Sequence, residues 1–201
     1  MKTCAKMMVA ALCLCLLLVG CGKQDAATSA TQPTTAPVNL TVEECYTYTK
    51  NADGTYSYEV RQRDGATLYA VNEGHRPASF EVANEDVLMV FGQAGTGVVA
   101  RWAKFCDIEN NRVSDAFGGY LATVDGRVAF LDNRTDAYHV FVCDPFAPYE
   151  YTQVVTLDGW VMSGDVIKDF ALSEEGVLSV TYATADGDKT VTIDLNATEE
   201  E

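Results

Sequence analysis

Five Asp-Gly dipeptides divide this sequence into short segments in which apolar and polar residues alternate. The pairs begin at Asp53, Asp64, Asp125, Asp158 and Asp186. An Asp-Gly pair between two alternating segments is a strong signal for a β-hairpin, because the tight turns that match strand twist need positive φ. No convincing amphipathic helix interrupts these segments. The sequence therefore predicts an all-β chain built as an antiparallel meander of hairpins.

The alternating segments give the expected strands. They lie at 43–50, 55–62, 66–72, 79–83, 86–92, 98–107, 119–124, 127–132, 138–143, 151–157, 166–172, 177–183 and 189–195. Strands of this number and length fit a sandwich or an open, barrel-like sheet. The alternative is a small propeller-like repeat of short blades.

Three of the expected hairpins show a faint internal repeat. Gly126 and Asp144 are 18 positions apart, as are Gly176 and Asp194, and a looser copy spans 86–107. Each copy has apolar residues two apart and ends in an aspartate where we expect the chain to leave the sheet. This pattern fits duplication of one hairpin, but it is also what hairpins have in common generally.

The first 20 residues have the proportions of a secretory signal. Lys2 and Lys6 give a positive start, and the uncharged run Met7–Val19 follows. A membrane-spanning helix needs about 20 apolar residues. The run is therefore too short to span a bilayer, and segments of this type are removed from the mature protein.

The apolar run ends in Leu18-Val19-Gly20-Cys21, which resembles the lipobox of bacterial lipoproteins. The resemblance implies a signal peptide at 1–20 and acylation of the Cys21 thiol with diacylglycerol, so that palmitate-type chains hold the protein in the bilayer. More than one acyl chain makes such anchoring stable. It also implies a location on the extracytoplasmic face of the cell membrane.

The segment after the lipobox has the composition of a tether. Residues 22–39 are rich in Thr, Ala and Pro and contain no aromatic side chain, so they cannot bury enough apolar surface to fold. We expect lipidated Cys21 and a flexible linker at 21–39, one extracytoplasmic all-β domain at 40–196, and an acidic tail at 197–201.

The charge of the chain restricts its partners. It carries 29 acidic residues against 14 Lys and Arg, a net charge of −15. Nucleic acids are excluded as partners, because their binding needs basic residues that displace condensed counterions. Anionic lipid headgroups would also repel this surface. We therefore expect a monomer that contacts the bilayer through acylated Cys21 alone.

No catalytic motif is present, so the sequence does not predict an enzyme. The glycine-rich segment 92–97 lacks the Lys-[Ser/Thr] ending of a phosphate loop. His75 and His139 are interpreted as structural. The acidic fragment 107–111 lacks the Gly and Glu of a calcium loop, and Asp-rich turns need no metal to explain them. We therefore predict no metal and no cofactor.

Three cysteines fall within the expected domain, Cys45, Cys106 and Cys143. Cys106 and Cys143 occupy equivalent strand ends, so they are the favoured pair if a disulfide forms. The alternative is that all three are buried thiols that pack as small apolar side chains.

The first hairpin yields the candidate ligand-binding residues, Tyr46, Tyr48, Tyr56 and Tyr58. A three-residue loop ending at Gly54 would place Tyr48 opposite Tyr58, so that all four tyrosines share one face of the sheet. This face either packs on the core with its hydroxyls at the rim or forms an exposed platform on which sugar rings stack.

These observations favour a membrane-anchored binding module for a cell-envelope ligand, which would be a glycan, a peptide or another protein. One alternative is an inhibitor of a cationic enzyme such as lysozyme, because the acidic charge would steer a basic partner. The other alternative is a hydrolase that uses paired carboxylates.

Overall fold

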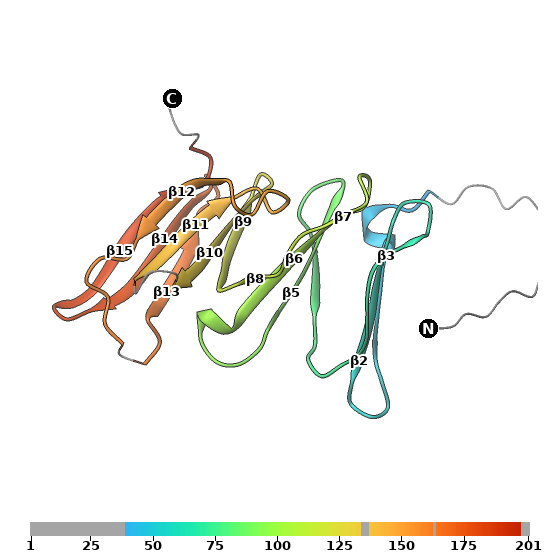
Figure 1. Ribbon diagram of the computed structural model, residues 1–201, viewed down its shortest axis with the longest axis horizontal. Helices are drawn as coiled ribbons and strands as arrows, with labels where there is room; N and C mark the ends of the chain where they lie inside the picture. Colours follow the sequence, from blue (N-terminus) through green and yellow to red (C-terminus); the bar gives the residue numbers. More distant parts are fainter. Residues whose placement is uncertain (1–38, 134–136, 163, 198–201) are drawn as a thin grey trace, which may run out of the picture. The chain divides into compact units, whose positions relative to one another are not determined.

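The computed structural model describes residues 39–133, 137–162 and 164–197. These residues form 15 β-strands in four antiparallel sheets, with two short 3-10 turns and no α-helix (Figure 1). The prediction of an all-β hairpin meander is therefore confirmed. Within the described residues the sheets do not close into a barrel.

Each sheet consists of strands that are consecutive in the sequence. Sheet 1 contains β1 (Tyr46–Lys50), β2 (Tyr56–Arg61) and β3 (Thr67–Gly74). Sheet 2 contains β4 (Ser79–Val82), β5 (Val87–Gln93), β6 (Arg101–Asp107) and β7 (Arg112–Val113), and β8 (Phe117–Gly118) also pairs with β6. Sheet 3 contains β9 (Tyr120–Val124), β10 (Arg127–Asn133), β11 (Tyr138–Cys143) and β12 (Tyr151–Thr156). Sheet 4 contains β13 (Ile167–Leu172), β14 (Val177–Thr184) and β15 (Gly187–Asp194).

The strands lie close to the expected segments, with three local differences. The beginnings of the segments 43–50 and 98–107 are the 3-10 turns η1 (Val42–Glu44) and η2 (Val98–Ala100). The two-residue strands β7 and β8 were not predicted, because so short a segment has no alternation to detect. Asp158-Gly159 lies between sheets 3 and 4 rather than within a hairpin, whereas the other four Asp-Gly pairs connect paired strands.

Three apolar layers hold the sheets face to face in chain order, which Figure 1 shows as successive colours from blue to red. The first layer joins Val60 of sheet 1 to Leu88 of sheet 2. The second contains Phe105 and Phe141, and the third contains Val140 and Val180. This succession of small packed sheets is nearer to the propeller-like alternative than to a two-sheet sandwich.

The two middle sheets are covered on both faces. Consecutive residues are therefore buried along Val128–Leu131 and along Val140–Cys143. The end sheets are covered on one face only, so burial alternates along β2 and β14. Their outer faces carry hydroxyl side chains, such as Thr47 and Thr49 on sheet 1 and Thr181 and Thr190 on sheet 4. Polar outer faces are typical of the terminal units of a repeat array.

The repeated hairpins share one register. The equivalent cross-strand pairs are Leu88 with Cys106, Val128 with Cys143, and Leu178 with Ile193. Every member of these pairs is at most 2% exposed.

The aspartate that follows each pair closes the turn at the end of the strand. Oδ1 of Asp107, Asp144 and Asp194 accepts a backbone N–H two or three residues later, at 2.9, 2.7 and 2.9 Å. The three sequence copies are therefore equivalent in structure, and their final aspartate has a turn-forming role.

Candidate functional site

A groove lies at the junction of sheets 2 and 3. Its widest section has a volume of about 660 Å³ and is bounded by β8, β10, the beginning of β11 and the loop that precedes β12. A second section of about 380 Å³ shares Asp115 and Pro148 with the first. A third section of about 250 Å³ shares Arg112 and Phe146 with the second. Because neighbouring sections share wall residues, we treat them as one feature, the junction groove.

The wall of the widest section is fixed by the crossing of the chain from sheet 2 to sheet 3. The N–H of Gly119 donates to the carbonyl of Arg101 at 2.8 Å, and its carbonyl accepts from the N–H of Leu131 at 2.9 Å. Gly119 has φ of +67°, and a Cβ atom there would overlap the carbonyl oxygen of Leu131. Only glycine therefore fits this crossing without displacing β10.

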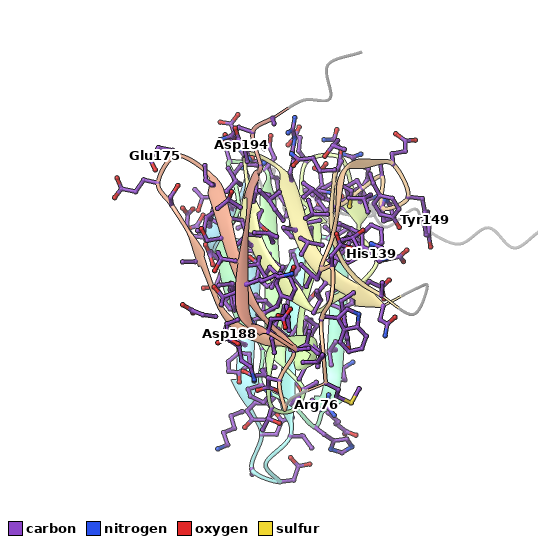
Figure 2. All side chains as sticks on the ribbon, turned by 90° about the vertical axis from the view of Figure 1, so that its left-hand side faces the viewer. Arg76, His139, Tyr149, Glu175, Asp188 and Asp194 are labelled. Atoms are coloured by element: carbon purple, nitrogen blue, oxygen red, sulfur yellow. The ribbon has the colours of Figure 1, made fainter. Side chains whose placement is uncertain are left out.

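Aromatic side chains form much of the same section. Phe117 and Phe130 pack with ring centroids 5.1 Å apart and belong to the second apolar layer. Tyr138 packs edge to face on Trp160 at 4.7 Å. Tyr149 differs from these rings because it is 75% exposed, and Figure 2 shows it projecting from the periphery of the molecule. The section thus combines a packed aromatic floor with one exposed ring.

The described residues that line the widest section include two carboxylates. They belong to Asp115 and Asp132, and no Lys, Arg or His is among the described residues that line this section. Oδ1 of Asp132 accepts the N–H of Asn133 at 2.8 Å, which orients that carboxylate. The described lining of this section therefore places carboxylates beside aromatic rings.

The adjoining section contains an arginine whose charge is already matched. Nη2 of Arg112 lies 2.6 Å from Oδ2 of Asp107, and its guanidinium lies 4.5 Å from the ring centre of Phe146. Burial alone would raise the pKa of Asp107, but hydrogen bonds from Asn110 and Arg112 outweigh it and hold this pKa below its ordinary value. The charge of Arg112 is therefore matched by Asp107 within this section.

The tyrosine hairpin has the expected register. Tyr48 is opposite Tyr58, Tyr46 is opposite Val60, and the N–H of Asn51 donates to the carbonyl of Thr55 at 2.8 Å. The four tyrosines therefore share one face of sheet 1, as predicted.

This face is covered unevenly by sheet 2. Tyr46 stacks on Phe80 of β4 with ring centroids 4.4 Å apart, and Tyr58 is 7% exposed. Tyr48 is 40% exposed, and its ring lies 6.0 Å from that of half-buried Tyr56. Packing on the core accounts for Tyr46 and Tyr58, and ligand binding by the more open pair stays a prediction.

The three cysteines of the domain are buried thiols that are not joined in a disulfide. Cys106 lies in the first apolar layer and Cys143 in the second, so the favoured disulfide is not formed: equivalent positions in successive sheets face different layers. Burial raises the pKa of Cys106 to about 12. These thiols therefore pack as apolar side chains rather than react as thiolates.

The other candidate features have local structural partners or lie outside the described residues. Nδ1 of His139 is 3.0 Å from Oγ1 of Thr156. Among the described residues no group of three or more His, Cys, Asp or Glu side chains could hold a metal ion, and no helix is long and apolar enough to cross a membrane. Cys21 and residues 22–38 of the tether lie outside the part of the chain that the structure describes.

The junction groove was not predicted from the sequence. One sequence feature that could have indicated this groove is the loop at 144–150, Asp-Pro-Phe-Ala-Pro-Tyr-Glu. In this loop two prolines and two aromatic residues follow a buried strand. A second signal was Gly118-Gly119, which directly precedes the next strand. Neither signal shows that the two segments meet, because their contact depends on how sheets 2 and 3 stack.

Comparison with known proteins gives no family. No family model matches the chain, and no curated protein matches it. One solved structure, described as the crystal structure of the eukaryotic initiation factor, is similar at 14% sequence identity and a TM-score of 0.40. The match covers 77% of this chain and 42% of that chain, so this chain spans less than half the length of that protein. The function has to be argued from the residues of this chain.

Proposed function

We propose that this chain is a lipid-anchored protein of the extracytoplasmic membrane face whose β domain binds a cell-envelope ligand in the junction groove. The observation that carries the proposal is the combination in one section of about 660 Å³ of the exposed Tyr149 ring with the Asp115 and Asp132 carboxylates. Sites for small ligands and short segments have volumes of this order, with apolar walls and a few polar groups.

The strands around the groove support a binding role, because they hold its wall in place. Gly119, which directly follows β8, is hydrogen-bonded through its backbone to Arg101 of β6 and to Leu131 of β10, and the aromatic floor belongs to the second apolar layer. A wall of paired strands loses little conformational entropy when a ligand binds. The loop that carries Tyr149 supplies the exposed part of the site.

The lipobox supports anchoring through Cys21, and the Thr- and Pro-containing segment after it supports a tether. As a flexible coil of about 18 residues the tether would average ~25 Å from end to end. The polar outer faces of the end sheets support a monomer. An anchored monomer would hold its groove within reach of other envelope components.

Inhibition of a cationic enzyme is the second candidate function. The observation that favours it is the lining of the widest section, whose described residues include the carboxylates of Asp115 and Asp132. A basic active-site cleft would be drawn to this surface by its charge.

Anchoring is tested by Cys21→Ser, with Cys15→Ser in the signal segment as the matched control. We expect Cys21→Ser to abolish labelling by a palmitate analogue and to leave either released protein or uncleaved precursor, whereas Cys15→Ser should label normally. Continued labelling of the Cys21→Ser variant would contradict lipidation at this residue.

Groove binding is tested with the mature chain carrying Cys21→Ser, by co-sedimentation with purified cell-envelope fragments. Tyr149→Ala should weaken binding by about tenfold, the effect expected of one exposed aromatic anchor. Tyr48→Ala is the matched control, because it removes another exposed tyrosine from sheet 1, where it does not line the junction groove. Loss of binding with Tyr48→Ala alone would assign the ligand to the tyrosine hairpin and overturn the groove.

A further inference from the structure

The smallest section of the junction groove, of about 250 Å³, is enclosed by turns of sheets 2 and 3. The turn before β5 contributes Asn84, and the turn after β6 contributes Asn110 and Arg112. The loop after β11 contributes Asp144 and Phe146. Sites for drug-sized ligands have volumes of about 300–1,000 Å³, so this section has room for one small ring.

A buried carboxylate positions two of these side chains. The side chain of Asp107 is 3% exposed, and its Oδ1 and Oδ2 accept from Nδ2 of Asn110 at 3.1 and 3.0 Å. Its Oδ2 also accepts from Nε and Nη2 of Arg112 at 3.2 and 2.6 Å. An amide that directs its nitrogen at Asp107 turns its own oxygen away, and a guanidinium held through Nε and Nη2 leaves Nη1 outside the pair. Asp107 thus holds one acceptor and one donor at the wall of the section.

Two further side chains each keep one polar atom for a ligand. Oδ1 of Asn84 accepts the N–H of Asp86 at 3.0 Å, which leaves Nδ2 as a donor. Oδ1 of Asp144 accepts the N–H of Phe146 at 2.7 Å, which leaves Oδ2 as an acceptor. Within the described residues neither remaining atom has another hydrogen bond. Together with Asn110 and Arg112, the section therefore presents two donors and two acceptors on side chains that are held by the turns.

The charges of the section are nearly balanced. Asp86 pairs with Arg63 at 2.6 Å, and Asp107 pairs with Arg112 at the same distance. Asp144 remains, so a carboxylate or phosphate entering the section would meet a like charge, and an ammonium group would meet the guanidinium of Arg112. A hydroxyl group is uncharged and both donates and accepts. A ring with several hydroxyls therefore matches this mixture better than an ion of either sign.

The apolar wall of the section favours the same class of ligand. Pro145 and Phe146 line both this section and the adjoining one of about 380 Å³. A sugar ring has hydroxyls at its edge and C–H groups on its faces, so it can bind the polar atoms while its face packs on these rings.

We propose that the junction groove binds a neutral oligosaccharide, with one sugar ring in the section lined by Asn84, Asn110, Arg112 and Asp144. This proposal rests on the proposed function and specifies the chemical class of its ligand. The next ring lies in the adjoining section, which shares Arg112 and Phe146 with the first.

The test measures binding of fluorescent probes to the mature chain with Cys21→Ser, by fluorescence anisotropy. Three neutral hexasaccharides are used, built from glucose, mannose and N-acetylglucosamine, with hexagalacturonate as the anionic probe and hexalysine as the cationic one. We expect at least one neutral probe to bind saturably. Because that probe is uncharged, its affinity should change by less than about twofold when salt rises from about 50 to about 300 mM.

Two isosteric substitutions test the section. Asn84→Asp keeps the oxygen that accepts from Asp86 and replaces the free donor by an acceptor. Asp144→Asn keeps the oxygen that accepts from Phe146 and replaces the free acceptor by a donor. Each should weaken saccharide binding by about tenfold, the loss of one well-placed hydrogen bond. The two variants change the net charge in opposite directions, so a response to charge alone would raise the affinity in one and lower it in the other.

Asp194→Asn is the matched control. Asp194 closes the equivalent turn at the end of β15, in the sheet that Figure 2 turns toward the viewer, and it does not line the section. Saccharide affinity should change by less than about twofold in this variant. An equal loss in Asp194→Asn and Asp144→Asn would show that these turns act only through the stability of the array, and would overturn the section as the binding site.

Failure of this inference differs in its outcome from failure of the proposed function. If no neutral probe binds while Tyr149→Ala still weakens co-sedimentation with envelope fragments, the groove remains a ligand site and the saccharide class is wrong. Saturable binding of a charged probe alone would contradict that class as well. If no probe binds and Tyr149→Ala leaves envelope binding unchanged, both proposals fail. A neutral probe whose binding is lost only with Tyr48→Ala would place the saccharide on the tyrosine hairpin and overturn the groove.

Discussion

Nη2 of Arg112 lies 2.6 Å from Oδ2 of Asp107, and the two side chains differ sharply in exposure, at 52% and 3%. The carboxylate is therefore enclosed while its charge partner reaches solvent. An enclosed carboxylate depends on the groups that satisfy it, which here include the N–H of Asn110 at 2.9 Å. Asp107 closes the same kind of turn as Asp144 and Asp194. Within the described part of the chain, it is the one of these three aspartates that forms an ion pair with an arginine.

We predict that Asp107→Asn lowers the free energy of unfolding by about 2 kcal/mol at pH 7, because it replaces a charged acceptor with a neutral one. The pKa of Asp107 lies below its ordinary value of 3.8 in the folded protein. The stabilisation from its charge is thus fully present above that value and is lost as pH falls below it. Urea unfolding at several pH values should show wild type and variant converging in acid. A difference that stays constant at low pH would contradict this account.

Asp194→Asn is the control for that variant. Its Oδ1 accepts the N–H of Asn196 at 2.9 Å, and Asp194 is exposed. An asparagine oxygen can accept the same bond, so the turn should persist. We expect a change in unfolding free energy within about 0.5 kcal/mol, the range of surface substitutions.

The tyrosine hairpin should respond unequally to truncation. Tyr58→Ala removes a ring that is 7% exposed, and we expect it to lower the free energy of unfolding by about 3 kcal/mol or more. Tyr48→Ala removes a ring that is 40% exposed and should lower it by less than about 1 kcal/mol. Chemical denaturation of both single variants measures the two effects. Equal effects would mean that sheet 2 covers the whole tyrosine face.

Alkaline conditions should destabilise the protein through its buried thiols. The thiol of Cys106 has an ordinary pKa of 9.0, and burial raises it to about 12 in the folded state. Between these values only the unfolded state releases the proton, so stability falls as pH rises, by about 1.4 kcal/mol per pH unit for this one group. Cys106→Val should make the measured slope shallower. Iodoacetamide should modify Cys106 in wild type only after denaturant is added, and rapid labelling of the folded protein would contradict its burial.

The crossing at Gly119 should be the glycine most sensitive to substitution. An alanine there would need a positive φ and would also meet the carbonyl oxygen of Leu131. Gly126 has a positive φ of +77° but nothing within 4 Å of an added Cβ. Gly126→Ala should therefore cost only the conformational strain, about 1–2 kcal/mol, and Gly119→Ala should lower the melting temperature considerably further. Equal melting temperatures would show that β10 yields easily to the added methyl group.

Local features were predictable because they depend on neighbouring residues alone. The Tyr48–Tyr58 register follows from a three-residue loop ending in a glycine with φ of +85°, Gly54. The shared register of the repeated hairpins likewise follows from apolar residues two apart, as in Leu178 and Val180.

The stacking of the sheets was not predictable in the same way. The runs Val128–Leu131 and Val140–Cys143 are apolar without alternation, which is typical of strands covered on both faces. The sequence therefore indicates that both faces of these strands are buried, but it does not indicate which sheets pack on the two faces. The predicted Cys106–Cys143 disulfide is wrong for this reason, because the two equivalent strand ends face different apolar layers. The junction groove depends on the same stacking and was missed with it.

Because each sheet is made of strands that follow one another directly, nearly all strand pairing joins segments that are close in the sequence. A chain leaving the ribosome could thus complete sheet 1 before sheet 4 has been synthesised, since pairing of near neighbours closes only small loops. An intermediate of this kind would lack the cover for the outward face of its last sheet, such as the face of sheet 3 that carries Val140 and Val142. The hairpin of β14 and β15 therefore ends the exposure of this face once it has been synthesised, and so limits association of the array as well as stabilising it.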